Sequence, residues 1–66
     1  MDLAQLRHMA NQIAKNFAIN GEEAAAIATA QHLQDFWDPR MKAAILADDR
    51  SLLDPIARAA VARLAP

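Results

Sequence analysis

The chain has 66 residues, with seven basic and eight acidic side chains, a net charge of −1 and no cysteine. This composition excludes disulfides, thiolate metal sites and thiol nucleophiles, and it provides no basic surface to attract nucleic acid or an anionic membrane. No run approaches the roughly 20 apolar residues that a membrane span requires, and the opening residues lack a signal-peptide pattern. We therefore expect a cytoplasmic protein with no nucleic-acid or membrane partner.

Helix-forming residues dominate the composition. Alanine is the commonest residue, glycine occurs once, and β-branched residues are few, which is typical of helices and not of sheets. We predict an all-α fold, with residues 1–66 forming a single helical domain. It should be a small bundle of three to four short helices at about residues 2–19, 22–37, 39–47 and 55–64.

The first predicted helix, residues 2–19, has two distinct faces after its N-cap Asp2. Its apolar stripe has the helical spacing of Leu3, Leu6, Ala10, Ile13 and Phe17. Beside that stripe lies a second face of small and polar residues, namely Ala4, Arg7, Asn11, Ala14 and Ala18. Small residues would let another backbone approach, and Arg7 and Asn11 offer it donors, although an ordinary solvated flank is the alternative.

The second predicted helix, residues 22–37, is apolar over a wide arc. Asn20-Gly21 should end the helix before it, and Glu22 suits its positive N-terminal end. A seam runs along Ala26, Ala30, Leu33 and Trp37, while Ile27 and Phe36 project to opposite flanks of the seam. This helix is therefore either central within the bundle or in contact with something outside it.

Aspartate followed by proline occurs twice and predicts two helix starts. Asp38-Pro39 opens the short helix 39–47, whose inward face is Met41, Ala44 and Ile45. A turn is expected at residues 48–50, because acidic groups disfavour a helix C-terminus. Asp54-Pro55 then opens the last helix, with its inward line at Ile56, Ala60 and Leu64.

Residues that could carry chemistry are scattered. His8 and His32 fall on different predicted helices without a third metal ligand nearby. The only hydroxyl side chains, Thr29 and Ser51, are expected to cap a helix or to face solvent. Asp38, three residues after Asp35, is better used as a cap than as half of an acid–base pair. We expect no enzyme activity, no metal site and no cofactor bound by this chain.

The junction of the second and third predicted helices brings together the bulkiest apolar groups. Phe36 and Trp37 are followed directly by Arg40 and Met41, and these residue types are enriched at the cores of protein interfaces. Burial of both aromatics inside the bundle is one interpretation. We expect instead that one ring packs in the core while the other is exposed to a partner.

Two blocks of sequence carry a resemblance to a known family. The first is Met9-Ala10-Asn11-Gln12-Ile13, and the second is the mid-chain block HLQDFWDPRMKAAIL, residues 32–46. Together they resemble the delta subunit of cytoplasmic, NAD-dependent, molybdenum-containing formate dehydrogenases. In the second block the matching residues are His32, Leu33, Phe36, Trp37, Pro39, Arg40 and Met41. The segment LLDPIARAAVARL, residues 52–64, is also similar to the closing helix of that family.

The resemblance implies an accessory subunit without chemistry of its own. The larger subunits of such an enzyme carry the molybdenum bis(pterin guanine dinucleotide) centre, iron–sulfur clusters, FMN and the NAD site. The implied role is docking on the catalytic alpha subunit, in support of assembly, cofactor-loaded maturation or stability. The predicted partner-binding residues are Arg7, Asn11, Gln12, His32, Phe36, Trp37, Pro39, Arg40 and Met41.

Two other functions remain open at this point. The chain could be a free-standing regulatory or adaptor bundle that binds another protein or, as a homodimer, itself. It could also be an acyl-carrier-like domain, since Ser51-Leu52 resembles the phosphopantetheine attachment site of those proteins. Arg50, however, stands where that site has an aspartate.

Overall fold

The computed structural model describes residues 2–65, and all regular structure within them is helical. Four α-helices occur in the order α1 (Leu3–Phe17), α2 (Glu22–Phe36), α3 (Pro39–Ala47) and α4 (Pro55–Leu64). Short 3₁₀ turns at Ala18–Asn20 and Arg50–Leu52 follow α1 and precede α4. The predicted all-α bundle is confirmed, and the predicted helix ends agree with the observed ends to within two residues.

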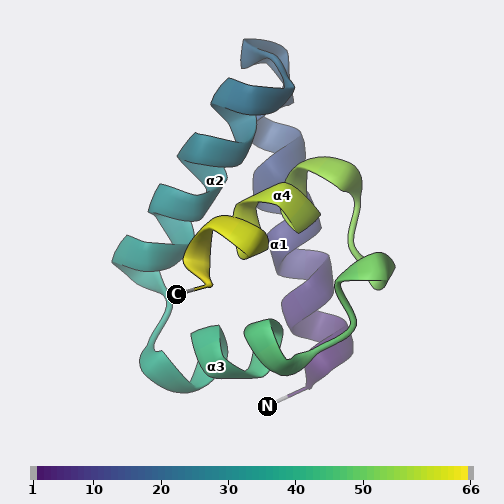
Figure 1. The fold of residues 1–66 in the computed structure, drawn as a ribbon, viewed down its shortest axis with the longest axis vertical. Helices are drawn as coiled ribbons and strands as arrows, with labels where there is room; N and C mark the ends of the chain where they lie inside the picture. Colours follow the sequence, from purple (N-terminus) through teal and green to yellow (C-terminus); the bar gives the residue numbers. More distant parts are fainter. Residues whose placement is uncertain (1, 66) are drawn as a thin grey trace.

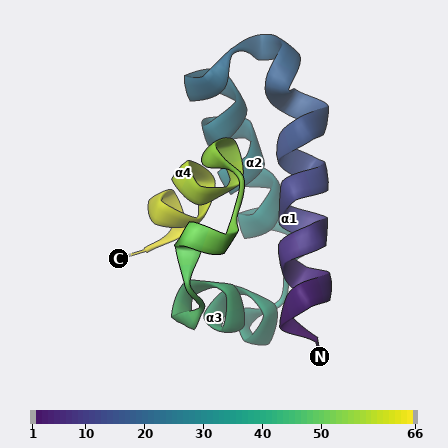
Figure 2. The same cartoon turned by 90° about the vertical axis from the view of Figure 1, so that its right-hand side faces the viewer.

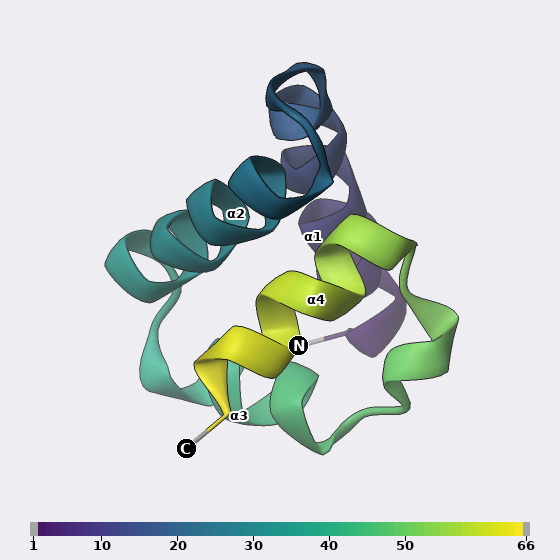
Figure 3. The same cartoon turned by 45° about the horizontal axis from the view of Figure 1, so that its top comes forward.

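The helices are arranged as two diverging arms with the remaining helices between them. Figure 1 shows α1 and α2 meeting at the Ala18–Asn20 turn and spreading apart, with α3 crossing the open end. α4 contacts all three other helices, and α2 contacts both α1 and α4. Figures 2 and 3 show α4 running beside α2, and α4 also contacts α1. The second predicted helix thus packs against α1 and α4, but its Ile27 and Phe36 stay exposed, so it is not enclosed on all sides by the bundle.

Local features of the sequence fix the starts of the first three helices. Asp2 Oδ1 accepts a hydrogen bond from the Ala4 amide (3.0 Å), and Asp38 Oδ1 accepts one from the Met41 amide (2.9 Å), as predicted. Gly21, at φ 94°, has a backbone conformation that side chains with a Cβ rarely adopt. Asp54 occupies the N-cap position of α4, so the predicted helix start is confirmed, but its side chain makes no capping hydrogen bond.

The core draws on all four helices and on the segment before α4. Its buried members are Leu6, Ala10, Ala14, Leu33, Trp37, Ile45, Leu53, Ala57 and Val61. In α4 the deepest residues are Ala57, Ala60 and Val61, whereas Ile56 and Leu64 are only partly buried. The predicted inward line of α4 is thus displaced by one residue, because a helix that contacts both arms buries two neighbouring lines.

Thr29 lies inside the bundle. Its side chain is fully buried on α2, and its hydroxyl has no hydrogen-bond partner within residues 2–65. One helical turn separates it from Ala25 on one side and from Leu33 on the other, and both are buried. The prediction that Thr29 caps a helix or faces solvent is therefore wrong, because its position on the buried stripe outweighs its polarity.

Candidate functional site: the corner between α2 and α3

The corner between α2 and α3 has a backbone that is fixed on both sides. α2 ends when the Trp37 amide donates to the Leu33 carbonyl (3.0 Å) and Trp37 turns extended, at ψ 136°. Pro39 disfavours helical geometry at Asp38 and occupies the first turn of α3. The Asp38 carboxylate then closes that turn on Met41. The corner is consequently a preorganised feature and not a free loop.

The two adjacent aromatic residues at this corner face opposite environments. Trp37 is 5% exposed and belongs to the core, whereas Phe36 is 74% exposed. The prediction that one ring is buried and the other exposed is confirmed. Trp37 is not accessible to a partner in this fold, so its prediction as a partner-binding residue is corrected. Its side chain packs in the core and attaches the corner to the bundle.

His32 supports the exposed Phe36 ring. The two residues are one turn apart on α2, and their ring centroids lie 4.8 Å apart with planes tilted by 39°. His32 itself is half-buried. This contact limits the orientations of the Phe36 ring. The ring therefore presents a large apolar surface to the solvent.

Beyond Phe36, the start of α3 adds polar and apolar atoms to the corner. Pro39 and Arg40 are exposed, while Met41 is half-buried against the core. Within residues 2–65 the only salt bridge joins Arg7 to Asp48, so Arg40 carries no ion pair in that part of the chain. The surface of the corner therefore consists of the half-buried His32 and the exposed Phe36, Pro39 and Arg40, and we call this set the α2–α3 corner.

The second face of α1 is used within the chain. Arg7 grips the Asp48 carboxylate with two hydrogen bonds, Nε to Oδ2 (2.5 Å) and Nη2 to Oδ1 (3.0 Å). These hydrogen bonds lower the pKa of Asp48 and raise the pKa of Arg7. Arg7 was predicted to donate to a partner, and in this structure its Nε and Nη2 donate to Asp48 of its own chain.

Asn11 is also engaged within the chain, and as an acceptor instead of a donor. Its Oδ1 accepts a hydrogen bond from the Asp54 amide (3.0 Å), and Ala14, one turn on, is 2% exposed. Residues 48–54 therefore cover the face that the sequence left open to a partner. Gln12 alone among the predicted α1 contacts remains exposed. The partners lie 41 and 43 residues away, and no local sequence signal points to them.

The segment that covers α1 is braced from its other side as well. Arg58 of α4 donates to the carbonyl oxygens of Arg50 (3.2 Å) and Leu53 (3.0 Å). The Ser51 hydroxyl donates to Asp49 Oδ1 (2.7 Å), and this hydrogen bond contributes to the lowered pKa of Asp49. Ser51 thus serves a local turn, which accounts for its presence without an attached group.

Neither a metal cluster nor a spanning helix is found in the part of the chain described. No three histidine, cysteine, aspartate or glutamate side chains in residues 2–65 are grouped so that they could hold a metal ion. No helix there is long and apolar enough to cross a membrane. The α2–α3 corner, with its exposed ring and unpaired guanidinium, is the strongest candidate site on these residues.

Comparison with known proteins assigns the chain to a family. Residues 5–61 match the family model described as NADH-dependent formate dehydrogenase delta subunit FdsD. No curated protein and no solved structure matches the chain. The matched range includes the α2–α3 corner, Arg7 and Asn11 of the second face of α1, and the segment that covers that face. The chain therefore belongs to the FdsD family, the delta subunits of NADH-dependent formate dehydrogenases.

Proposed function

We propose that this chain is a non-catalytic accessory subunit of a cytoplasmic formate dehydrogenase and that it docks on the catalytic alpha subunit through the α2–α3 corner. Docking supports assembly, cofactor-loaded maturation or stability of the enzyme. The single observation that carries the proposal is Phe36, a large aromatic side chain that is 74% exposed at a rigid corner. Family membership supports association with the other subunits of the complex.

The energetics of Phe36 favour an intermolecular role. Burying such a side chain contributes roughly 1.5–3 kcal/mol, and within this chain that free energy is not used. The backbone around Phe36 is already fixed by the Asp38 cap and Pro39, and the ring has a contact with His32. A partner pocket therefore gains the apolar contact while little conformational entropy is lost on binding.

The other members of the corner fit the periphery of such an interface. Arg40 is exposed and offers a planar set of donors to a carboxylate or a carbonyl group of the alpha subunit. Pro39 adds rigid apolar surface beside it. Trp37 and Met41 do not contact the partner in this proposal, because their side chains pack on the core and attach the corner to it. The docking residues proposed are thus His32, Phe36, Pro39 and Arg40.

The chemistry of the complex is assigned to the other subunits in this proposal. The molybdenum centre, the iron–sulfur clusters, FMN and the NAD site belong to the larger subunits, and this chain acts on them only by keeping the protein around them assembled. Its effect on activity is therefore expected in the amount of active enzyme and not in the rate of each loaded enzyme molecule.

Copurification tests the docking surface directly. The tagged chain is coexpressed with the remaining subunits as wild type, Phe36→Ser or Arg40→Glu, and the alpha subunit recovered with it is quantified. Phe36→Ser is expected to reduce recovery by about tenfold or more, and Arg40→Glu by a smaller factor. Ile19→Ser is the matched control, because Ile19 is 93% exposed on the turn between α1 and α2.

The controls make the result unambiguous. Circular dichroism and thermal melting must show that the variants are folded. Full recovery of the alpha subunit with folded Phe36→Ser would rule out the corner as the docking site, as would equal losses for Phe36→Ser and Ile19→Ser.

Molybdenum analysis separates two forms of the accessory role. If the subunit supports cofactor-loaded maturation, alpha subunit made with Phe36→Ser contains less molybdenum per protein. If it acts only as a brace, the molybdenum content is unchanged at synthesis and the enzyme loses activity faster during storage.

A further inference from the structure

The Asn20-Gly21 pair lies in the turn between α1 and α2 and takes no part in the α2–α3 corner. Figure 1 shows this turn at the end of the molecule opposite α3. All residues from 18 to 24 are exposed, and Ile19, directly before the pair, is 93% exposed. Water therefore reaches both members of the pair.

The turn requires a glycine, and this requirement has a chemical consequence. Gly21 has φ 94°, a conformation that residues with a Cβ rarely adopt. Apart from its chain neighbours, no atom lies within 4 Å of the place where a Cβ would be. An asparagine carboxamide is open to attack by the next backbone nitrogen, and glycine, which has no side chain, hinders that attack least. The glycine that the backbone requires is therefore also the neighbour that protects Asn20 least.

One hydrogen bond restrains the attacking nitrogen. The Gly21 amide donates to the Ala18 carbonyl (3.1 Å) within the exposed 3₁₀ turn. Exposed turns with few buried contacts open locally at a low cost in free energy, while the helices on either side remain folded. Opening of this single turn frees the Gly21 nitrogen to approach the Asn20 carboxamide.

The other two asparagines of the chain lie in different surroundings. Asn11 is within α1, and its Oδ1 accepts a hydrogen bond from the Asp54 amide (3.0 Å). Asn16 is exposed but also lies within α1, where the next residue is the bulky Phe17. Helical geometry keeps the following nitrogen away from the carboxamide at both positions. Both are therefore internal controls for Asn20.

We propose that Asn20 is a modification site, at which the folded chain deamidates to aspartate and isoaspartate. The Gly21 nitrogen gives up its proton to water, and its electron pair forms a bond to Asn20 Cγ. The carboxamide C–N bond breaks, and the departing NH₂ group takes up a proton and leaves as ammonia. A cyclic imide then joins the two residues.

Water opens the imide in one of two ways. Addition at the side-chain carbonyl restores the normal backbone and yields aspartate. Addition at the main-chain carbonyl routes the backbone through the side chain of residue 20 and yields isoaspartate. Overall, water is consumed and ammonia is released, so no oxidant, reductant or metal ion is required.

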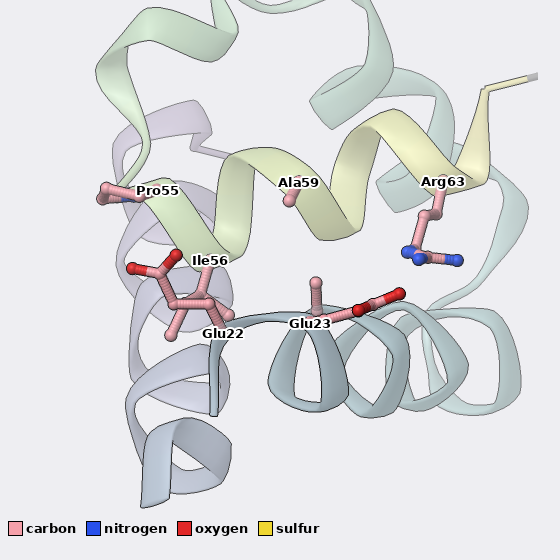
Figure 4. Close-up of a pocket in the computed structure, with 7 residues that line it drawn as sticks. Glu22, Glu23, Pro55, Ile56, Ala59 and Arg63 are labelled. Carbon is pink, nitrogen blue, oxygen red and sulfur yellow. The ribbon is translucent and has the colours of Figure 1, made fainter. Parts of the chain in front are cut away.

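Both products place a new carboxylate just before the two acidic residues that begin α2. Figure 4 shows Glu22 and Glu23 in a pocket between α2 and α4. The one salt bridge within residues 2–65 is Arg7–Asp48, so neither glutamate is neutralised by a salt bridge in that part of the chain. The glutamates repel the new carboxylate, whereas the positive N-terminal end of α2 attracts it. Because these effects oppose each other, the aspartate product should be about as stable as the parent chain.

The isoaspartate product differs, because its backbone is longer by the Cβ of residue 20. This extension displaces the Gly21 amide from the Ala18 carbonyl, so the hydrogen bond of the turn is lost. The unfolding midpoint should fall by about 4–8 °C, the shift expected in a domain of this size for the loss of one such hydrogen bond. Isoaspartate formation thus loosens the junction of α1 and α2.

Peptide mass spectrometry of the full-length chain, after incubation at mildly alkaline pH, tests the site. Asn20 should gain the mass that separates an acid from an amide, while Asn11 and Asn16 should stay unchanged. Methyl transfer from S-adenosylmethionine by an isoaspartyl methyltransferase distinguishes isoaspartate from aspartate. Asn20→Gln should abolish the modification, because glutamine would have to form a larger ring.

A parallel incubation in urea shows whether the folded chain itself reacts. Globally unfolded chains are fewer than about one in a hundred under native conditions, whereas opening of the turn alone is more frequent. Asn20 in the folded chain should therefore react at no less than about a hundredth of its rate in urea. A slower folded rate, or equal modification of Asn16 and Asn20 in the folded chain, overturns the proposal.

Asn20→Asp is the matched variant for the effect on stability. It has the new charge with a normal backbone and should unfold within about 2 °C of wild type, whereas the purified isoaspartate form should unfold about 4–8 °C lower. Equal midpoints for these two forms would contradict the loss of the turn. Phe36→Ser should deamidate like wild type, so failure of the modification site and failure of the docking surface are separate results.

Discussion

The two Asp-Pro corners of this chain begin helices in the same way but are stabilised differently. At the first, Asp38 is extended, Pro39 follows, and the Asp38 carboxylate caps the Met41 amide. At the second, Asp54 is also extended before Pro55, yet its side chain caps nothing and its amide is held by Asn11 of α1. The same dipeptide therefore fixes the helix start in both places, while the supporting contacts are local in one and distant in the other.

This difference determines which surface is free. Residues 48–54 are held by Arg7, by Asn11 and by Arg58, and Leu53 is 3% exposed in the core. The first corner is stabilised by hydrogen bonds among its own residues, and Trp37 and Met41 attach it to the core. Its outer side, with Phe36, is left to another molecule. A corner that is stabilised by its own neighbouring residues can thus present a binding surface. A corner that is held by contacts with distant residues cannot.

The largest expected effect separates the two aromatics of the first corner. Trp37→Ala should reduce the free energy of unfolding by about 3–5 kcal/mol, because it empties a core position. A chain of this size is stable by only about 3–10 kcal/mol, so the variant should be partly or wholly unfolded. Phe36→Ala is the matched control and should change stability by less than about 0.5 kcal/mol. Urea denaturation followed by circular dichroism measures both, and equal losses would contradict the division between core and surface.

The caps give a smaller contrast between the corners. Asp38→Ala should cost about 1 kcal/mol, within a usual range of 0.5–2 kcal/mol, because the Met41 amide loses its acceptor. Asp54→Ala removes no capping hydrogen bond and should cost only a few tenths of a kcal/mol. Thermal unfolding of the two variants side by side gives the comparison. A greater loss for Asp54→Ala would show that the second corner depends on its own side chain after all.

The distant support of the second corner can be removed by itself. Asn11→Ala takes away the acceptor of the Asp54 amide and should cost roughly 0.5–1.5 kcal/mol. Hydrogen exchange at that amide should speed up at the same time. Gln12→Ala, at the exposed neighbouring position, should leave both measurements unchanged. Unaltered exchange at Asp54 in the Asn11 variant would mean that the contact does not hold the corner.

The smallest effect is the pH dependence of the Arg7–Asp48 contact. The folded pKa of Asp48 is lowered by the hydrogen bonds from Arg7, so this contact stabilises the fold above the unfolded pKa of about 3.9. As the pH falls through the lower, folded pKa, the carboxylate is protonated and that stabilisation is lost. Asp48→Asn should therefore be less stable than wild type at neutral pH, and the gap should close in acid. A gap that stays constant from neutral pH into acid would contradict this origin.

What could be predicted from the sequence follows the same division between local and distant contacts. Helix limits, the Asp2 and Asp38 caps and the buried seam of Ala26, Ala30, Leu33 and Trp37 all depend on spacing or on neighbours within a turn or two, and all were predicted. Arg7–Asp48 and Asn11–Asp54 join residues 41 and 43 positions apart, and nothing in either segment specifies its partner. These contacts follow from how the helices pack, which spacing alone does not determine.

The candidate site was predicted in outline and corrected in its members. Residue types pointed to the first corner, and the family resemblance pointed to the same residues. The pattern did not say that Phe36 is the exposed ring, since both aromatics suit a core. The buried Thr29 was missed for a related reason, because its polar side chain lies on an otherwise apolar stripe. Burial follows position on the helix in both cases, and the residue type is secondary.

The most direct test of the account combines two measurements on Phe36→Ala: the free energy of unfolding and the affinity for formate dehydrogenase purified without its delta subunit. The account predicts unfolding within about 0.5 kcal/mol of wild type together with about tenfold or weaker binding. Wild-type affinity in a fully folded Phe36→Ala chain would contradict the claim that this corner is built for another polypeptide.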